Sequence, residues 1–285
     1  MQLSKNALGQ IAAQPRLEIP SAKLLGLPEK VLQFGTGVLL RGLPDYFIDK
    51  ANKQGIFNGR VVIVKSTDSD SSAFDKQDGL YTICVRGVEN GKTIEENIIN
   101  ASVSRVLSAN TEWKRILECA HNLEMKIILS NTTEVGIQLT DDNINDEPPS
   151  SFPGKLLAFL QERFKAFNGS AESGMVIVPT ELITDNGSKL ESIVLELAHL
   201  NNLDFKFIEW LETNNIFCNS LVDRIVPGKP NAEELKRTEE TLGYTDELLT
   251  NSEVFRLWAI EGNEKIKEVL SFYKADDAVV ITPDI

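Results

Sequence analysis

Apolar runs alternate with longer segments of helical spacing along most of this chain. The runs lie at residues 31–34, 60–64, 125–130 and 175–179. Between them, apolar positions recur every three or four residues, as on one face of a helix. Strands of a parallel sheet are buried on both faces and are therefore continuously apolar. The pattern predicts an α/β fold of Rossmann-like type with a mostly parallel sheet.

One region departs from this alternation. Residues 80–86 and 94–106 have strand character and flank Asn90-Gly91, a dipeptide that favours a hairpin turn. We therefore expect an antiparallel insertion in the sheet. Helices are expected at residues 39–53, 111–122, 156–167, 188–199 and 204–213. A capping box over Ser188-Lys189-Leu190-Glu191 is expected to open the fourth of these.

The first apolar run passes directly into a glycine turn and a helical segment. Gly35 and Gly37 follow the run, and helical spacing begins two residues later. This is the layout of the strand, tight turn and helix that bind the pyrophosphate of a dinucleotide. Gly35 permits a sharp turn, and Gly37, without a Cβ, leaves room for the phosphates. Leu40 replaces the usual third glycine, so an ordinary strand–loop–helix remains the alternative.

The residues after the second apolar run leave the choice of dinucleotide open. In a simple NAD-binding fold, an acid at the end of this strand binds the adenosine ribose. Here Lys65 comes first, and Asp68 and Asp70 come only afterwards. Lys65 favours a 2′-phosphate, whereas Asp68 can accept a hydrogen bond from a ribose hydroxyl. A Lys65 that is merely solvated at the strand end is the alternative.

Polar side chains also follow the third run, at the carboxyl end of a strand, where open α/β sheets bind ligands. Asn131 and Thr132 are placed to bond a nicotinamide ribose, and Glu134 is placed to transfer a proton. A capping turn, in which these side chains bond the backbone, is the alternative. Farther on, Asp223-Arg224 stands among apolar residues and is expected either in a buried ion pair or facing a cleft.

Composition narrows the classes of partner. The chain has 285 residues, 42% of them hydrophobic and 25% charged, as in ordinary globular proteins. Its net charge of −13 opposes binding to nucleic acid or to an anionic membrane, because the field repels phosphate. No apolar run is long enough to predict a membrane span. An anionic cofactor must therefore be held by local donors.

The cysteines and histidines point away from metal chemistry. Cys84, Cys119 and Cys218 show no CxxC spacing and are expected to be buried thiols in a reducing cytoplasm. His121 and His199 lie far apart and have no partners at ligand spacing. We therefore expect neither a metal site nor a Ser-His-Asp triad.

Four motifs occur in order: QFGTGVLLRG at 33–42, SNTTEVGI at 130–137, PTELITDNG at 179–187 and NSLVDRIVPG at 219–228. Together they resemble the long-chain mannitol dehydrogenase family of polyol and sugar-acid oxidoreductases. The QDGLYT run at 77–82 and the SNTTE form of the second motif are most similar to members that reduce tagaturonate. The resemblance extends from about residue 28 to the end.

This resemblance implies metal-independent, NAD-linked reduction of a keto sugar acid, with mannitol or fructuronate as the alternative substrate. It places NAD on the first motif, with Asn131 and Thr132 near the nicotinamide ribose. It also places Glu134, Asn186 and Asp223 close to the reaction centre. The cofactor-binding residues expected at the first motif are Val31, Leu32, Gln33, Phe34, Gly35, Thr36, Gly37, Val38, Leu39, Leu40, Arg41 and Gly42.

Members of this family use a lysine as general acid/base, set in a Lys-x-x-x-x-Asn-x-x-His run on a following helical domain. The sequence contains no such run, so we expect that lysine and most of the helical substrate domain to lie outside it. Three regions are then expected: a lead-in over 1–28, an NAD-binding domain with its insertion over 29–230, and the start of the connection to the helical domain over 231–285. A non-catalytic dinucleotide-binding module is the rival interpretation.

Overall fold

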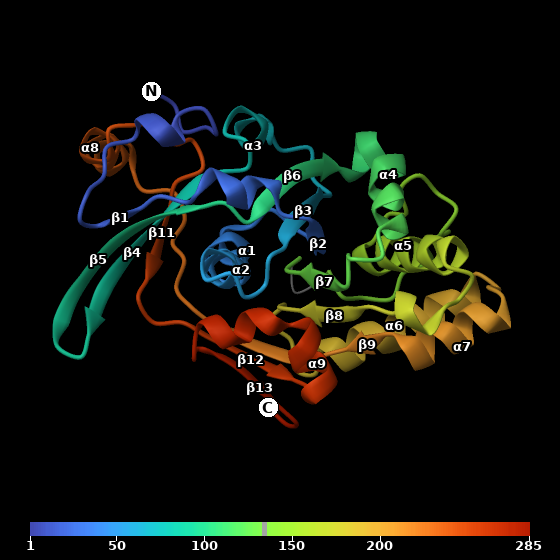
Figure 1. Ribbon diagram of the computed structural model, residues 1–285. Coiled ribbons are helices and arrows are strands. Elements are labelled where there is room, and N and C mark those ends of the chain that lie inside the picture. Colours follow the sequence, from blue (N-terminus) through green and yellow to red (C-terminus); the bar gives the residue numbers. More distant parts are fainter. Residues whose placement is uncertain (133–135) are drawn as a thin grey trace.

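A six-stranded sheet forms the centre of the molecule in the computed structural model, which describes residues 1–132 and 136–285 (Figure 1). Its strand order is β6-β3-β2-β7-β8-β9, and every pairing is parallel. The strands are β2 (Glu29–Phe34), β3 (Arg60–Lys65), β6 (Val103–Ser108), β7 (Ile127–Ser130), β8 (Val176–Pro179) and β9 (Ile216–Phe217). The predicted α/β fold with a mostly parallel sheet is confirmed.

Both faces of this sheet are buried, which explains the continuous apolar runs. On one face, Leu32 and Ile128 pack in a core with four helices. These are α4 (Ala109–Glu118), α5 (Phe152–Ala166), α6 (Asn186–Leu200) and α7 (Phe205–Asn214). On the other face, Val31 and Leu129 pack with α2 (Pro44–Lys53) and with Trp258 from the C-terminal part. Alternate residues of each strand therefore belong to different cores.

The antiparallel insertion is confirmed, and its strands pair in a sheet of their own. β4 (Tyr81–Glu89) and β5 (Lys92–Asn100) form a hairpin around Asn90-Gly91, where both residues have positive φ. β1 (Leu17–Glu18) pairs with β5, and β11 (Thr250–Glu253) pairs with β4, both in parallel. The run predicted as strand over 94–106 is divided between β5 and β6, which lie in different sheets.

Two helix predictions need correction. The segment predicted as one helix over 39–53 is α1 (Val38–Gly42) followed by α2, and Leu43 between them has φ −128° and ψ −76°. Pro44 opens α2, and a proline has no N–H to continue the first helix. The capping box is wrong, because α6 begins at Asn186, and the Ser188 N–H donates to Asn219 Oδ1 instead.

The N-terminal residues, expected as a lead-in, are packed against the hairpin sheet. Leu3, Leu8 and Ile11 are buried in one apolar cluster with Leu80 and Tyr244. The segment is therefore part of the folded structure and not a loose arm.

Elements after residue 230 pair with earlier strands. β12 (Leu257–Glu261) is antiparallel to β10 (Ser220–Asp223) and parallel to β13 (Val279–Thr282). The other α-helices of the described residues are α3 (Ser72–Lys76), α8 (Ala232–Leu242) and α9 (Glu264–Val269). The expected division at residue 230 stays a prediction.

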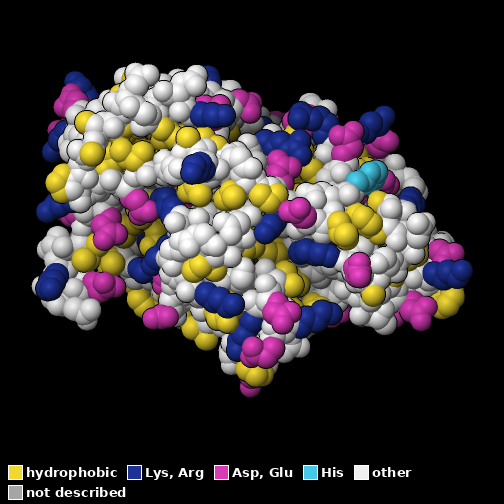
Figure 2. All heavy atoms as spheres, viewed as in Figure 1, with side chains coloured by type: hydrophobic (Ala, Val, Ile, Leu, Met, Phe, Trp, Pro, Cys, Tyr) yellow, Lys and Arg dark blue, Asp and Glu magenta, His cyan; other side chains and the backbone are white. Residues whose placement is uncertain are grey.

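The surface shows no broad field of one charge sign in the view of Figure 2, where acidic and basic side chains lie interspersed. Within the described residues, the helices are too short or too polar for any of them to traverse a lipid bilayer.

Candidate functional site

The glycine turn after β2 lies at the carboxyl end of the central sheet. Gly35 has φ +124°, and a Cβ there would stand 2.9 Å from Asn131 O and 2.9 Å from Leu40 Cδ1. A side chain at Gly35 would therefore clash with backbone. At Gly37 the opposite holds, because a Cβ would meet no atom of the described chain within 4 Å. The backbone of Gly37 is open to a ligand.

Residues 31–42, which are expected to bind NAD, differ in their exposure to solvent. Residues 31–34 are buried in β2, and residues 40–42 are buried beneath neighbouring segments. Residues 35–39 are at least partly exposed. A ligand at this turn can therefore touch only residues 35–39 directly. The buried residues on either side give the turn its shape.

After β3, the two candidate cofactor residues have different surroundings. Lys65 is buried, and its Nζ donates to Ser69 O, so it is not solvated at the strand end. That bond uses one of the three ammonium hydrogens, and the burial of the side chain keeps the group away from a solvent-facing 2′-phosphate. Asp68 is exposed, and its Oδ1 accepts from Asn110 Nδ2 at 2.8 Å. Asp68 therefore presents a carboxylate to solvent after the second strand of the fold.

Glu181, which the motif reasoning missed, organises the ends of β7 and β8. It is 3% exposed, and its Oε1 accepts from the N–H and Oγ1 of Thr132 at 2.9 and 3.0 Å. Its Oε2 accepts from Ser130 Oγ at 3.0 Å. Asn131 Nδ2 donates to Thr180 O at 2.8 Å. The bond from Asn131 to backbone is that of a capping turn, whereas Thr132 bonds a side-chain carboxylate. Contact of Asn131 and Thr132 with a nicotinamide ribose stays a prediction.

Glu134, expected to transfer a proton, lies outside the described residues. Asn186 lies within them and is 1% exposed. Its Nδ2 donates to Pro179 O, Glu181 O and Ser220 O at 3.2, 3.0 and 2.9 Å, and its Oδ1 accepts from the Ser220 N–H at 2.9 Å. Asn186 thus joins the end of β8 to β10. Its side chain is committed to backbone, and a role at a reaction centre stays a prediction.

The Asp223-Arg224 prediction is corrected in part. Among the described residues, no ion pair joins the two, and Asp223 is exposed while Arg224 is buried. Arg224 donates to Gly42 O at 2.5 Å and to Glu253 O at 2.9 Å, and it lies 4.5 Å from the centre of the Tyr46 ring. Burial lowers the pKa of Arg224 to about 10, so it stays charged at neutral pH. Arg224 therefore connects α1, which follows the glycine turn, to the end of β10, where Asp223 is exposed.

A cavity of about 340 Å³ opens beside this network. Residues 181–185 after β8, Asn219, residues 220–222 of β10, and Ile285 line it. Leu182 and Leu221 on its wall are 70% and 53% exposed. The cavity lies at the carboxyl end of β8, on the side of the parallel sheet where open α/β sheets bind ligands.

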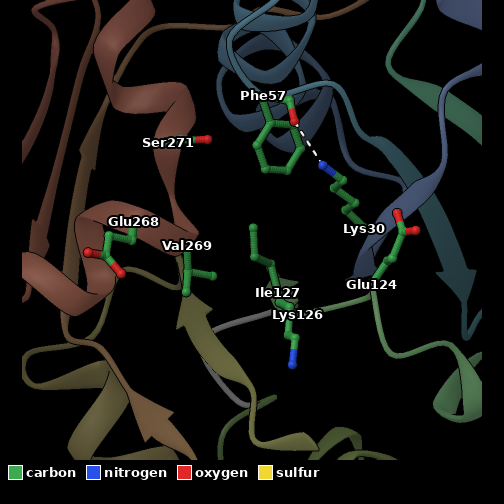
Figure 3. Close-up of a pocket in the computed structure, with 8 residues that line it drawn as sticks. All are labelled: Lys30, Phe57, Glu124, Lys126, Ile127, Glu268, Val269 and Ser271. Atoms are coloured by element: carbon green, nitrogen blue, oxygen red, sulfur yellow. Dashed lines mark hydrogen bonds between the residues drawn. The ribbon is translucent and has the colours of Figure 1, made fainter. Parts of the chain in front are cut away.

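A second cavity, of about 370 Å³, lies at the amino ends of the central strands, on the side of the sheet opposite the glycine turn (Figure 3). Lys30 and Lys126, near the amino ends of β2 and β7, line it together with Glu268. Lys30 Nζ donates to Phe57 O at 3.1 Å across it. None of the residues predicted for the site lines this cavity.

Within residues 1–132 and 136–285, no group of three or more His, Cys, Asp or Glu side chains is placed to hold a metal ion. The three cysteines are free and buried, as expected. Burial raises the pKa of Cys84 and Cys119 to about 11 and that of Cys218 to about 12. The thiols are therefore protonated at neutral pH and unreactive as nucleophiles.

The order of strands, the glycine turn and the later motifs match one protein family. The profile of the mannitol dehydrogenase Rossmann domain matches residues 29–271. The chain belongs to this family.

Curated relatives of this mannitol dehydrogenase family chain include altronate oxidoreductases. That of Bacillus subtilis (strain 168) is 42% identical over 260 residues, which cover 90% of this chain and 54% of the relative. That of Halalkalibacterium halodurans is 39% identical over 276 residues, which cover 96% and 53%. The chain thus spans about half the length of these relatives.

Solved structures share the fold. Pseudomonas fluorescens mannitol 2-dehydrogenase, in ternary complex with NAD and D-mannitol, matches with a TM-score of 0.82 at 21% identity, over 100% of this chain and 58% of that one. A substrate-free D-sorbitol dehydrogenase also gives 0.82, at 22% identity, over 100% and 59%. At such low identity the likeness shows the fold alone, and it agrees with the predicted Rossmann-like class.

Proposed function

We propose that this chain is the NAD-binding part of an oxidoreductase that reduces tagaturonate to altronate in hexuronate catabolism. The observation that carries the proposal is the glycine turn with open backbone at Gly37, in a family member about 40% identical to altronate oxidoreductases. Mannitol and fructuronate are the competing substrates within the same family.

The turn fits the pyrophosphate of NAD. A Cβ at Gly37 would occupy free space, and residues 36–39 offer backbone N–H groups there, whereas the Gly35 N–H donates to Val64 O. Because α1 has five residues, we assign the binding to these N–H groups rather than to a long helix dipole. Asp68 accepts from the adenosine ribose, and Asn131 and Thr132 border the nicotinamide ribose.

In the proposed reaction, bound NADH supplies a hydride to the keto carbon of the sugar acid. The keto oxygen takes up a proton at the same time, which balances the conversion of the carbonyl to an alcohol. In the proposed assembly a lysine outside this sequence donates that proton. Glu134 and Asp223 are supporting acids close to the reacting carbon. The residues that line the cavity of about 340 Å³ form one wall of the site for the sugar acid.

Calorimetric titration with NADH tests the proposal. Gly37→Val places a branched side chain where the phosphates lie, and we expect its dissociation constant to rise roughly tenfold or more. Gly26→Val is the matched control, because a Cβ there also meets no described atom, and it should bind like the unaltered chain. Equal affinity of a folded Gly37→Val variant would contradict the proposed site.

The exposed carboxylate of Asp68 and the burial of Lys65 favour NADH over NADPH. Dissociation constants for the two dinucleotides, measured at one salt concentration, test this preference. Tighter binding of NADPH would reverse the assignment of Asp68.

We also expect this chain to bind NADH without turning over tagaturonate by itself. No Lys-x-x-x-x-Asn-x-x-His run lies within its 285 residues, and a positioned general acid contributes roughly 10²–10⁴-fold. NADH oxidation is assayed on this chain and on a version extended by a relative's helical domain, with fructuronate and mannitol alongside. Comparable rates from the two would assign the proton to Glu134 or Asp223.

A further inference from the structure

A buried polar cluster lies beneath the glycine turn. Gln33 at the end of β2 and Asp45 in α2 are both 0% exposed. Gln33 Nε2 donates to Asp45 Oδ2 at 3.3 Å and to Gly35 O at 3.4 Å. The hydroxyl of Tyr81 lies 3.4 Å from the same carboxyl oxygen and donates to Arg41 O at 3.1 Å. The cluster connects α2 to the carbonyl of the first glycine in the turn.

Two oxygens of this cluster have no hydrogen-bond partner in the described part of the chain: Gln33 Oε1 and Asp45 Oδ1. They belong to side chains that already share one bond. Buried polar atoms are nearly always paired, because water is no longer there to bond them. A carboxylate has no hydrogen to offer, so an ionised Asp45 leaves both oxygens unpaired. A proton on Asp45 Oδ1 that is donated to Gln33 Oε1 satisfies both atoms.

Arg41 is the cation that faces Asp45. Its Nη1 donates to Leu248 O at 2.5 Å, and the centre of its guanidinium lies 5.9 and 5.5 Å from the rings of Phe74 and Tyr81. Its Nε has no partner among the described residues. Arg41 is therefore held by a carbonyl and two rings, and within the described residues no hydrogen bond or ion pair joins it to Asp45.

The other charged groups near Asp45 lie on the same helix. Asp49, one turn farther along α2, is paired with Lys53 Nζ at 2.7 Å, and its own charge disfavours a second carboxylate. Burial raises the pKa of Asp45 to about 7, against the opposing effects of Gln33, Arg41 and Tyr81. The two forms of Asp45 are therefore both accessible near neutral pH.

We propose that Asp45 is a neutral carboxylic acid that forms a two-bond ring with the Gln33 amide and so fixes the carbonyl of Gly35. One amide hydrogen of Gln33 completes the ring, and the other reaches Gly35 O. Loss of the proton replaces one bond of the ring with repulsion between two oxygens, which frees Gln33 and loosens the turn. Gln33 and Asp45 are thus positioning residues, and the role in NADH binding rests on the proposed function.

The consequence is a pH-dependent affinity for NADH. The neutral acid holds the turn in its binding shape, so affinity is highest below about pH 7 and falls as the pH rises through that value. Asp45→Asn keeps a neutral side chain that can donate to Gln33 Oε1 and accept from Gln33 Nε2. This variant should show little pH dependence.

The test combines calorimetry with infrared spectroscopy on the full 285-residue chain. NADH titrations between pH 6 and 8.5 should show the affinity falling roughly fivefold or more. Asp45→Asn should flatten this profile. Asp49→Asn, the buried control on the same helix, removes a charge that raises the pKa of Asp45, so it should keep the pH dependence with a midpoint at lower pH. Infrared difference spectra between the unaltered chain and Asp45→Asn should show a protonated carboxyl band at pH 6 that weakens toward pH 8.5.

The outcomes separate the inference from the proposed function. Absence of the carboxyl band at pH 6 would mean that Asp45 is ionised beside Arg41, and it would overturn the inference. A band accompanied by a flat NADH profile would overturn the positioning role. If NADH fails to bind at any pH, the proposed function fails, while the infrared bands still decide whether Asp45 holds a proton.

Discussion

Two buried polar networks lie at the carboxyl ends of the central strands. They differ in whether every buried oxygen has a hydrogen-bond partner. In the network of Glu181 and Asn186, both carboxylate oxygens of Glu181 and the Oδ1 of Asn186 accept hydrogen bonds. Around Gln33 and Asp45, two oxygens of the described structure have no partner. A fully paired network has one arrangement, because any change leaves a buried group unsatisfied. A network that one proton can complete has two, and pH selects between them.

The largest effect is expected from breaking the complete network. Asn186→Leu removes four buried hydrogen bonds and leaves the N–H of Ser220 without its acceptor, whereas Pro179 O and Glu181 O keep bonds from Ser220 Oγ and from the Ile183 N–H. We expect a loss of unfolding free energy on the order of 3–5 kcal/mol, measured by urea denaturation. Asn6→Leu, at an exposed asparagine, is the control and should change stability by less than about 0.5 kcal/mol. Equal losses would show that the Asn186 bonds contribute nothing.

The incomplete network should instead respond to pH. The pKa of Asp45 is raised from 3.8 to about 7 on folding, so the native state holds a proton that the unfolded chain releases. Its stabilising contribution is full below pH 3.8 and is lost as the pH rises to about 7. The Asp45→Asn variant has no carboxyl group at this position and should not lose stability for this reason as the pH rises.

The stability of Asp45→Asn relative to the unaltered chain should therefore rise by about 2–3 kcal/mol between pH 5 and 8, since each pKa unit is worth about 1.4 kcal/mol. Urea denaturation of both chains at the two pH values measures the difference. A constant difference would show that Asp45 does not change its protonation in this range.

A smaller effect is expected from a conservative change in the complete network. Glu181→Gln replaces one acceptor oxygen with an NH₂ group that faces a donor of Ser130 or Thr132. The expected loss is about 1–3 kcal/mol, with weaker NADH binding because the Asn131-Thr132 segment shifts. Thermal unfolding and calorimetry on the same sample check both effects. Unchanged stability would mean that the network adapts, which would contradict the single-arrangement account.

The sequence predicted the central sheet well, because a strand that is buried on both faces is visible in the sequence as a continuous apolar run. The runs at 31–34, 60–64, 125–130 and 175–179 became β2, β3, β7 and β8. Local turn chemistry was equally visible at Asn90-Gly91. What escaped prediction depends on contacts between distant residues, as in the pairing of β11 with β4.

The candidate site shows the same division. The two glycines could be recognised from residue type alone: Gly35 has a positive φ that favours glycine, and Gly37 leaves open space for a ligand. Asp45 did not, because a carboxylate on a helix usually faces water, and only packing of the hairpin sheet against α2 buries it. The enclosure of Asn186 likewise depends on β10, more than thirty residues away in the sequence.

Hydrogen–deuterium exchange with and without saturating NADH tests the placement of the dinucleotide most directly. It compares the carboxyl ends and the amino ends of the central strands in one experiment. The proposed site predicts slower exchange at residues 35–39 and around Asn131, with no change at residues 124–127 and 268–271 around the cavity of Figure 3. Protection at the Figure 3 cavity, with unchanged exchange at the glycine turn, would contradict the account.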